Sequence, residues 1–317
     1  MMSTRVIVLG AGGFMGRAVW HVLAQDPECN HIAVHFRRPP EPAMLPYRAD
    51  TWRALDLVDA TPAQIIDLIE QSEADVVVNC AGATHGSLAE LRSANVEVPA
   101  KLGAALTTLR HVHLIHLGSA AEYGVHRTGE AITENTPARP VSDYGVTKLE
   151  ATRQLLAAGH AGRLTATVLR VFNPLGRGSA PSTLPGRAAR QLDAAMQRGD
   201  VSLTLGSLES WRDYIDARDV GGAIAAAIRT VPDGAMVLNV GRGEAVHTRD
   251  LVERLAAIAG FKGRIIESDD GSSRSSPVPW QRADISTTSS WLHWLPRHSI
   301  DASLHDLWSG VREGVSA

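Results

Sequence analysis

Short, almost continuously apolar runs alternate with longer amphipathic stretches along the chain as far as Val171. The runs are rich in Val, Ile and Leu, which is typical of strands buried on both faces of a parallel sheet. They comprise Arg5–Leu9, His31–Phe36, Asp75–Asn79, Val112–Leu117 and Leu164–Val171. The stretches between them, which suit crossover helices, comprise Gly13–Gln25, Pro62–Gln71, Leu88–Leu109 and Asp143–Ala158. This alternation predicts an α/β fold with a doubly wound parallel sheet.

Beyond Val171 the pattern becomes less regular, which predicts a smaller and discontinuous second part of the fold. We expect helices at Leu184–Gln197, Asp216–Arg229 and His247–Ala259, and strands at Val201–Leu205 and Met236–Val240. Segments rich in Pro, Gly, Ser or Asp predict loops at Pro39–Pro46, Asn173–Pro185 and Ser268–Ser276. Four of the seven tryptophans lie close to the C-terminal end of the sequence and predict a small cap packed on the main domain: Trp280, Trp291, Trp294 and Trp308.

Composition narrows the class of protein. The 31 Lys and Arg residues balance 34 Asp and Glu to a net charge of −3, so no charge excess favours nucleic acid or an anionic membrane as a partner. Cys29 and Cys80 are too few for a disulfide framework or a Cys-rich zinc site. No apolar run reaches the roughly 18 residues that span a bilayer, and Met1–Arg5 leads directly into a strand. We therefore expect a cytoplasmic globular protein with one large domain and a smaller appendage.

A glycine-rich turn joins the first apolar run to the first amphipathic stretch. Its sequence is Gly10-Ala11-Gly12-Gly13-Phe14-Met15-Gly16. Gly10 permits a sharp turn, Gly13 lets the backbone approach a pyrophosphate, and Gly16 lets the helix pack closely on the strand. Free N–H groups at the helix N-terminus would bind the phosphates. An isolated glycine-rich turn is weak evidence, but a strand before it and a helix after it predict a Rossmann-type dinucleotide site.

The end of the second strand distinguishes NAD from NADP in such folds. An acidic residue roughly 20 positions after the glycines binds the ribose hydroxyls of NAD, whereas an arginine suits the 2′-phosphate of NADP. Here Arg37 and Arg38 follow the strand, so we expect NADP(H) to be preferred, with NAD(H) possible; alternatively, both are solvated loop charges. Asp56 and Leu57 lie where the chain would reach the adenine, and Asn79-Cys80-Ala81-Gly82 closes another strand at the ligand-binding edge.

Three further side chains are expected to converge at that edge. Tyr144 and Lys148 are spaced i and i+4, which places both on one face of a helix that Ser142 or Asp143 would cap. A free tyrosine has a pKa near 10 and transfers protons poorly at neutral pH, whereas a nearby lysine cation favours the phenolate. Ser119 ends a strand, where its hydroxyl would polarise a substrate carbonyl.

Together these motifs resemble the extended short-chain dehydrogenase/reductase family, in its NAD(P)-dependent epimerase/dehydratase group acting on nucleotide sugars. The resemblance covers nearly the whole chain and extends to Asn95, Tyr123-Gly124, Leu169–Gly176 and Arg212–Val220. It implies an enzyme with a nicotinamide cofactor and a nucleotide-sugar substrate. It also implies that Asn173 and Arg212 contact the nucleotide diphosphate, with Arg282 a weaker candidate, and a guanidinium suits diphosphate oxygens.

We assign the site residues and domain boundaries on this basis. The expected catalytic residues are Ser119, Tyr144 and Lys148. The expected cofactor-binding residues are Gly10, Gly13, Phe14, Met15, Gly16, Arg37, Arg38, Asp56, Leu57, Cys80, Ala81, Gly82, Tyr144, Lys148 and Phe172. The expected substrate-binding residues are His85, Ser119, Ala120, Tyr144, Asn173, Arg212 and Arg282. Residues 1–171 with about 213–240 would form the NAD(P)-binding domain, and about 172–212 with 241–317 the substrate domain.

Dehydration, epimerisation and ketone reduction all use such a site. Dehydratases that resemble this family place Asp-Glu directly after the serine or threonine, where this chain has Ala120 and Ala121, and Glu122 comes one residue late. Epimerases that resemble it keep NAD tightly bound, with an acidic residue where this chain has Arg37. Both departures favour NADPH-dependent 4-ketoreduction of a nucleoside-diphosphate 4-keto-6-deoxysugar. An NAD-dependent nucleotide-sugar epimerase is the alternative.

Three more expectations concern binding. A non-catalytic NADP(H)-binding sensor is an alternative of another class, although such relatives commonly lose the tyrosine or lysine that this chain keeps. His111 and His113 share one face of a strand whereas His116 points to the other, so we expect no metal site. Related proteins dimerise through helices equivalent to Leu88–Leu109 and Asp143–Ala158, so we expect a homodimer.

Overall fold

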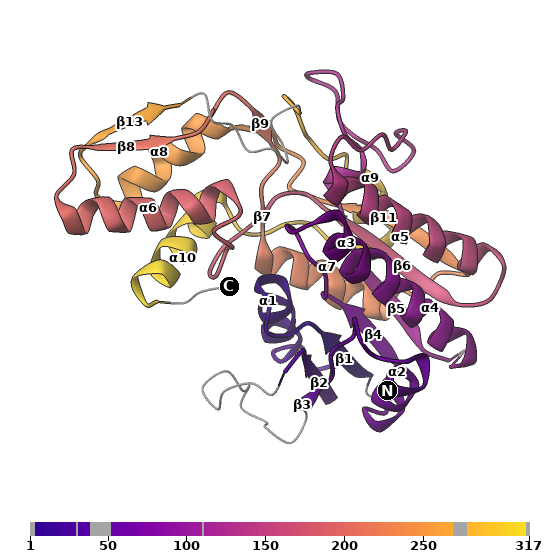
Figure 1. Ribbon diagram of the computed structural model, residues 1–317. Helices are drawn as coiled ribbons and strands as arrows, with labels where there is room; N and C mark the ends of the chain where they lie inside the picture. The colour runs from indigo at the N-terminus through magenta and orange to yellow at the C-terminus, as the bar shows by residue number, and fades with distance from the viewer. Residues whose placement is uncertain (1–3, 30, 39–51, 110, 269–277, 315–317) are drawn as a thin grey trace.

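The computed structural model of the chain describes residues 4–29, 31–38, 52–109, 111–268 and 278–314. Within these residues, seven parallel strands form one sheet in the order β11-β6-β5-β4-β1-β2-β3 (Figure 1). The strands are β1 (Arg5–Leu9), β2 (His31–Phe36), β3 (Trp52–Ala54), β4 (Val76–Asn79), β5 (His113–Ser119), β6 (Thr165–Val171) and β11 (Ala235–Val240). The strand order reverses between β1 and β4, and ligands bind at such a reversal. The predicted doubly wound sheet is therefore confirmed.

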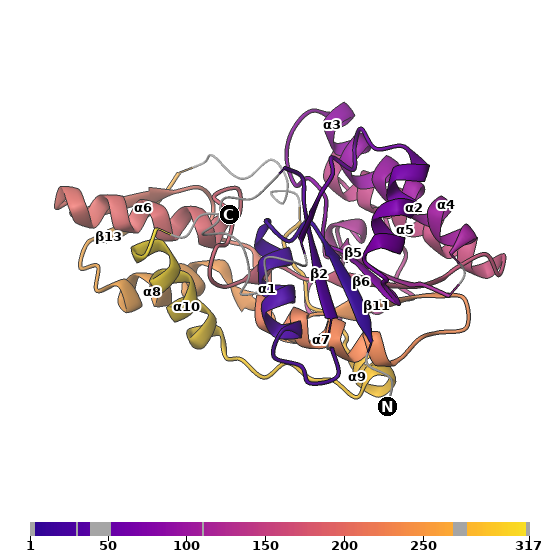
Figure 2. The same ribbon diagram turned by 90° about the horizontal axis from the view of Figure 1, so that it is seen from below.

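Helices cover both faces of this sheet, as Figure 2 shows. One face carries α1 (Phe14–Leu23), α7 (Ala217–Arg229) and α9 (Ser286–Leu292), and the other carries α2 (Pro62–Gln71), α4 (Val98–Thr108) and α5 (Asp143–His160). Each face has its own hydrophobic core: Val8, Val19 and Ile224 belong to the first, and Ile7 and Leu102 to the second. Successive residues of a strand point to opposite faces, which is why strands feeding two cores are mainly apolar and do not alternate with polar residues. We call this part of the molecule the large lobe.

A small lobe lies beside the carboxyl ends of the strands (Figure 1). It consists of α6 (Leu184–Arg198), α8 (Thr248–Ala259), α10 (Ile300–Arg312) and the parallel pair β8 (Ser202–Leu205) and β13 (Arg264–Glu267). Its core is formed by fully buried leucines on all three helices, including Leu192, Leu255 and Leu304. Two shorter pairs lie between the lobes, namely β7 (Pro174–Leu175) with β10 (Ile215–Asp216) and β9 (Trp211–Arg212) with β12 (Val246–His247).

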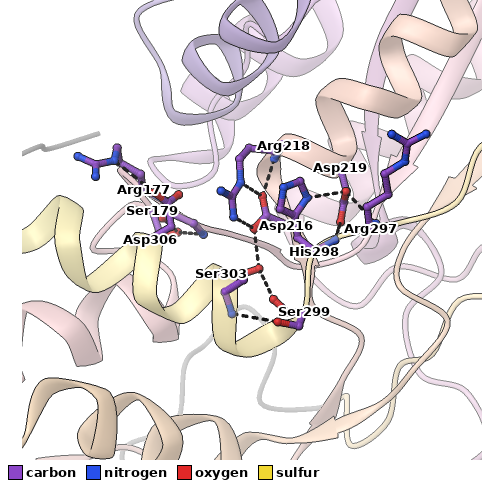
Figure 3. Close-up of polar contacts among 12 residues, drawn as sticks. Arg177, Ser179, Asp216, Arg218, Asp219, Arg297, His298, Ser299, Ser303 and Asp306 are labelled. Carbon is purple, nitrogen blue, oxygen red and sulfur yellow. Dashed lines mark hydrogen bonds and ion pairs between the residues drawn. The ribbon is translucent and has the colours of Figure 1, made fainter.

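A polar network fastens the small lobe to the first turn of α7 (Figure 3). Asp216 caps α7, pairs with Arg218 at 2.7 Å and accepts a 2.6 Å hydrogen bond from Ser303 of α10. Asp219 accepts the backbone N–H of His298, whose Nδ1 also lies 2.8 Å from Asp219 Oδ1. Two buried carboxylates on one helical turn therefore hold the segment that leads into α10.

The tryptophan-rich tail does not form one cap. Trp294 packs in the core of the large lobe beside Leu292 of α9, whereas Trp308 packs in the core of the small lobe. The predicted substrate domain includes this whole tail, and that domain assignment stays a prediction; α9 packs against the core of the large lobe. Pro39–Pro46 and most of the loop Ser268–Ser276 lie outside the described residues.

The prediction of one helix over Leu88–Leu109 is wrong in one respect. The segment divides into α3 (Leu88–Arg92), a π-helical turn at Ser93–Glu97 and α4. A π turn inserts one extra residue into a helix and frequently occurs at functional sites. Here it surrounds Asn95, which is fully buried.

No helix in the described part of the chain is long and apolar enough to cross a membrane.

Candidate active site

A cleft of about 690 Å³ opens at the carboxyl ends of the strands and is lined from both lobes. Its volume is within the usual range for a pocket that binds a small molecule or cofactor. Twelve of the predicted site residues line it: Gly13, Phe14, Met15, Cys80, Gly82, His85, Ser119, Ala120, Tyr144, Lys148, Asn173 and Arg212. The other predicted residues lie beside or behind this lining.

The glycine-rich turn has the geometry that a pyrophosphate requires. Gly10 has a φ of +74°, a left-handed conformation that favours glycine. A Cβ at Gly16 would overlap the carbonyl group of Gly10, so α1 packs against the turn only because Gly16 has no side chain. Gly13 caps α1 without a side-chain hydrogen bond to its first turn. Together the bare backbone N–H groups and the close approach of Gly13 to the cleft fit the diphosphate of a dinucleotide.

The end of β2 presents its two arginines to solvent. Arg37 Nε lies 2.6 Å from Asp56 Oδ2, and Asp56 also accepts the backbone N–H of Val58. Partial burial raises the pKa of Asp56. The hydrogen bonds from Arg37 and Val58 have the larger opposite effect and hold that pKa below its ordinary value. Leu57 packs in the core of the large lobe, which leaves its backbone, rather than its side chain, to contact a ligand.

Two buried asparagines hold the backbone that follows β4. Asn79 Oδ1 accepts the N–H of Ala81, and Asn95 pairs with both backbone groups of Ala83, at 2.9 Å and 2.8 Å. Asn95 Nδ2 also donates to Thr147 in α5, so the π-helical turn joins this loop to the helix that carries Lys148. Burial raises the pKa of the Cys80 thiol to about 12, so Cys80 lines the cleft as a neutral apolar group.

Ser119, Tyr144 and Lys148 line the same cleft from two elements. Ser119 is the last residue of β5, and Tyr144 and Lys148 lie on α5, which Ser142 caps by accepting the N–H of Gly145. Lys148 is buried and donates a 2.8 Å hydrogen bond from Nζ to the carbonyl oxygen of Leu117. This arrangement places a hydroxyl, a phenol and an ammonium group around one space, as proton transfer to a carbonyl requires.

The substrate side of the cleft is polar. Arg212 is buried and donates to the carbonyl oxygens of Trp211 and Val278. Asn173 donates to the carbonyl oxygen of Asp213 and to Gln281 Oε1, at 2.9 Å and 3.3 Å. These contacts fix both side chains at the wall of the cleft.

Of the predicted residues outside this lining, Arg282 and Phe172 face elsewhere. Arg282 points toward the carbonyl oxygen of Gly129 at 3.4 Å, whereas its neighbour Gln281 faces the cleft. Side chains alternate along an extended segment, so only one of two neighbours can face a given side. Phe172 is fully buried against Tyr123 behind the cleft. Lining residues that the sequence did not single out include Thr183, Arg187, Ser210, Tyr214, Thr248 and Gln281.

The strand histidines are structural. His113 contacts the hydroxyls of Thr165 and Thr167, and burial lowers its pKa to about 4. Burial also lowers the pKa of His116 far below its ordinary value, and Lys148 adds to that effect. Among the described residues, no group of three His, Cys, Asp or Glu side chains could hold a metal ion.

The chain is similar to known proteins both in sequence and in structure. The family model described as NAD dependent epimerase/dehydratase family matches residues 6–241. The dTDP-6-deoxy-L-talose 4-dehydrogenase (NAD(P)(+)) of Kitasatospora kifunensis is 36% identical over 311 residues, covering 96% of this chain and 95% of that protein. The GDP-6-deoxy-D-mannose reductase of Pseudomonas aeruginosa is 28% identical over 327 residues, covering 98% and 100%.

Solved structures agree with these matches. RMD from Pseudomonas aeruginosa complexed with NADPH superposes with a TM-score of 0.81 and 25% identity, covering 98% of this chain and 100% of that chain. MoeE5 in complex with UDP-glucose and NAD gives a TM-score of 0.82 and 26% identity, covering 98% and 99%. The predicted Rossmann-type fold and the predicted class of nicotinamide-dependent enzyme are thereby confirmed.

Proposed function

The chain belongs to the NAD dependent epimerase/dehydratase family, and from that premise we propose that it reduces the 4-keto group of a nucleoside-diphosphate 4-keto-6-deoxysugar. The observation that supports this most directly is the composition of the cleft beside Ser119. Ala120 and Ala121 line it where a dehydratase would need a carboxylate pair, and Glu122 is turned away into a buried ion pair with Arg170. Ser119, Tyr144 and Lys148 suffice for carbonyl reduction, which requires one proton donor and one carbonyl-polarising group.

Two relatives support the same reaction. The Kitasatospora relative is named as a 4-dehydrogenase of a dTDP-6-deoxysugar, and that reaction run backward is reduction of a 4-ketone. The Pseudomonas relative is named as a reductase of a GDP-6-deoxysugar. The two names share the sugar chemistry and differ in the nucleotide, so the proposal specifies a 4-keto-6-deoxysugar and not the base.

In the proposed reaction the protein holds the ketone and supplies its proton. A bound reduced nicotinamide supplies the hydride to the carbonyl carbon. Ser119 donates a hydrogen bond to the carbonyl oxygen and Tyr144 transfers its phenolic proton to that oxygen, which leaves a phenolate beside the Lys148 ammonium. Lys148 favours that phenolate electrostatically and orients the ribose of the cofactor. Arg212 and Asn173 bind the diphosphate, because a guanidinium donates to two phosphate oxygens at once.

We propose NADPH as the preferred reductant. Arg37 is exposed at the end of β2, where its Nε pairs with Asp56, and its position there suits a 2′-phosphate. NADH would be accepted less well, because the same arginine would meet only ribose hydroxyls.

The proposal is tested with the purified full-length protein. Nucleotide released by denaturation is identified first, and the protein is then supplied with NADPH or NADH and the 4-keto-6-deoxysugar of dTDP, GDP or UDP in turn. We expect cofactor oxidation with one of these sugars and a product that has gained two hydrogens by mass spectrometry. Tyr144→Phe should abolish turnover and retain NADPH binding, because it removes only the transferable proton.

Two other outcomes would identify the alternatives. Tightly bound NAD⁺, with interconversion of nucleotide sugars and no net cofactor consumption, would replace the reductase by an epimerase. NADP(H) binding without turnover of any nucleotide sugar, in wild type and Tyr144→Phe alike, would indicate the non-catalytic sensor.

A cytoplasmic location and a homodimer through the segment Leu88–Leu109, which includes α3 and α4, and through α5 also stay predictions. Leu88 and Val146 are exposed apolar residues on neighbouring helices of that side, which supports an interface there. Light scattering of the purified protein measures the mass in solution, and a monomer would contradict the dimer.

A further inference from the structure

A buried ion pair lies directly behind Ser119. Glu122 is fully buried and the Arg170 side chain is 6% exposed, with 2.8 Å between Glu122 Oε2 and Arg170 Nε. Removing two charges from water costs several kcal/mol, and apolar replacements of such pairs are often no less stable. A gain in folding stability therefore does not explain why this buried ion pair is present. Its other contacts indicate a further role.

The second oxygen of Glu122 contacts the proposed catalytic serine. Oε1 accepts the backbone N–H of Ser119 at 2.8 Å, and Ser119 Oγ accepts the backbone N–H of Ala121 at 3.2 Å. The two bonds form a capping box around the single 3₁₀ turn Ala120–Glu122. A hydroxyl that accepts an N–H with its lone pair donates its own hydrogen elsewhere. The box therefore directs the Ser119 hydroxyl hydrogen away from the turn and toward the cleft.

The surroundings leave Glu122 little freedom. A Cβ at Gly118 would lie 2.6 Å from Glu122 Oε1, so the carboxylate reaches Ser119 only because residue 118 is glycine. The Arg170 guanidinium lies 4.5 Å from the centre of the Tyr123 ring, and the Tyr123 hydroxyl donates to Asn239 at 2.7 Å. Arg170 belongs to β6, which pairs with β5 at Ser119 and Val171. The pair thus fixes Ser119 to the strand that leads to Asn173.

We propose that Glu122 is a positioning residue, which sets the direction of the Ser119 hydroxyl and is itself held by Arg170. Glu122 touches neither substrate nor cofactor and acts through Ser119 alone. This inference rests on the proposed function in one respect, because it takes Ser119 as the group that polarises the carbonyl.

A double-mutant cycle with Ser119→Ala and Glu122→Gln tests it. A glutamine at 122 cannot accept from both Ser119 N–H and Arg170 Nε–H in the present geometry, since one of its two groups is itself a donor. We expect Glu122→Gln to lower kcat by about tenfold to a hundredfold, less than the roughly hundredfold to thousandfold loss that removing such a donor outright causes, with the NADPH dissociation constant and KM changed less than about twofold. In the Ser119→Ala background the same change should have almost no further effect.

Two companion variants separate positioning from folding. The double variant Glu122→Met with Arg170→Met removes both charges together and should fold, because no buried charge is left without a partner. Its kcat should fall by the same factor as that of Glu122→Gln. A crystal structure of that variant should show the Ser119 hydroxyl turned to another rotamer, a readout independent of turnover. Glu150→Gln, which breaks the exposed pair with Arg92, should leave kcat unchanged.

Several results would overturn the inference. If the fold losses of kcat in Ser119→Ala and Glu122→Gln multiply in the variant that carries both changes, Glu122 acts by general stability rather than through Ser119. An unchanged kcat in Glu122→Gln, or an unmoved Ser119 in the Met/Met structure, would also exclude positioning. If wild type reduces no ketosugar, the proposed function fails instead, and the Ser119 rotamer in the Met/Met structure still decides the positioning role.

Discussion

The ammonium of Lys148 donates a hydrogen bond of 2.8 Å to the carbonyl oxygen of Leu117, two residues before Ser119 on the same strand. This bond ties the helix that carries Tyr144 to the strand that ends in Ser119. Lys148 is 6% exposed, and a buried ammonium needs such an acceptor. One contact therefore both anchors the cation and brings the three proposed catalytic groups together.

Lys148→Met should lower kcat by about a hundredfold or more, because the apolar stem is retained and the positive charge beside Tyr144 is lost. Stability should change by about 1 kcal/mol or less, which thermal unfolding checks. Lys101→Met is the matched control, because Lys101 Nζ also donates to a main-chain carbonyl, that of Val58, away from the cleft lining. Equal losses of activity in the two variants would exclude a chemical role for Lys148.

Arg37→Ala should weaken NADPH binding by about tenfold to a hundredfold, the value of a charge-assisted hydrogen bond of about 1.5–3 kcal/mol. Binding of NADH should change by less than about threefold, because NADH has no 2′-phosphate. Fluorescence titration of the purified protein with each cofactor measures both constants. Arg53→Ala is the control, because Arg53 lies on the adjacent strand and donates to the carbonyl oxygens of Trp52 and Gln71. Equal weakening of NADPH and NADH by Arg37→Ala would contradict a role in cofactor choice.

Gly16→Ala should destabilise the protein by about 1–3 kcal/mol and abolish cofactor binding, because its Cβ would overlap the Gly10 carbonyl group and push α1 away from the turn. Gly103→Ala provides the contrast, since a Cβ there would meet side-chain atoms of Leu155 and Leu164 at 3.5 Å and 3.7 Å. That substitution in α4 should be neutral or stabilise by about 0.5–1 kcal/mol. Urea unfolding and NADPH titration check both variants. Retention of cofactor binding in Gly16→Ala would show that the helix can shift without disturbing the phosphate site.

His113 should make the protein acid-sensitive. Burial lowers its pKa from 6.5 to about 4, so the unfolded chain binds the proton more readily than the folded chain. The neutral imidazole thus contributes stability that is present above about pH 6.5 and is lost as the pH falls toward about 4. In urea unfolding, His113→Gln should be less stable than wild type near neutral pH, and the gap should narrow by about 2–3 kcal/mol on acidification. His111→Gln, which removes an exposed histidine two residues away, is the control for the substitution itself. If the free energy of unfolding of His113→Gln ran parallel to that of wild type from neutral to acidic pH, a lowered pKa of His113 would be contradicted.

Sequence periodicity predicted the large lobe well because each strand feeds two cores. Val76–Asn79 and Thr165–Val171 are buried on both faces and rich in Val, Leu and Ala, so their pattern can be read even in short segments. The three-residue strand β3 was missed because it is too short to show any period. Local chemistry also predicted the cofactor turn, since the left-handed φ of Gly10 and the contact of Gly16 with the Gly10 carbonyl group both arise within the turn itself.

The substrate wall was harder to predict because it is assembled from distant segments. Gln281 faces the cleft through a contact with Asn173, more than a hundred residues away, and nothing in its own surroundings indicates this. The family resemblance offered Arg282 as a weaker candidate for this wall, whereas its neighbour Gln281 is the residue that lines the cleft. One residue in an extended segment is enough to reverse the side, and the role of Arg282 stays a prediction.

The π-helical turn at Ser93–Glu97 contains one residue more than a regular α-helical turn. This extra residue sets the rotation of Asn95 about the helix axis and therefore its contacts with the loop beside the cleft. Deleting one residue from this turn would restore a regular α-helix and rotate its two halves relative to each other by about 100°. Asn95 could then no longer face both Ala83 and Thr147, although every side chain that lines the cleft would be unchanged. A single-residue insertion or deletion in a turn that does not itself line the cleft can therefore alter cofactor affinity, so comparisons of relatives by matched residues alone would overlook this kind of divergence.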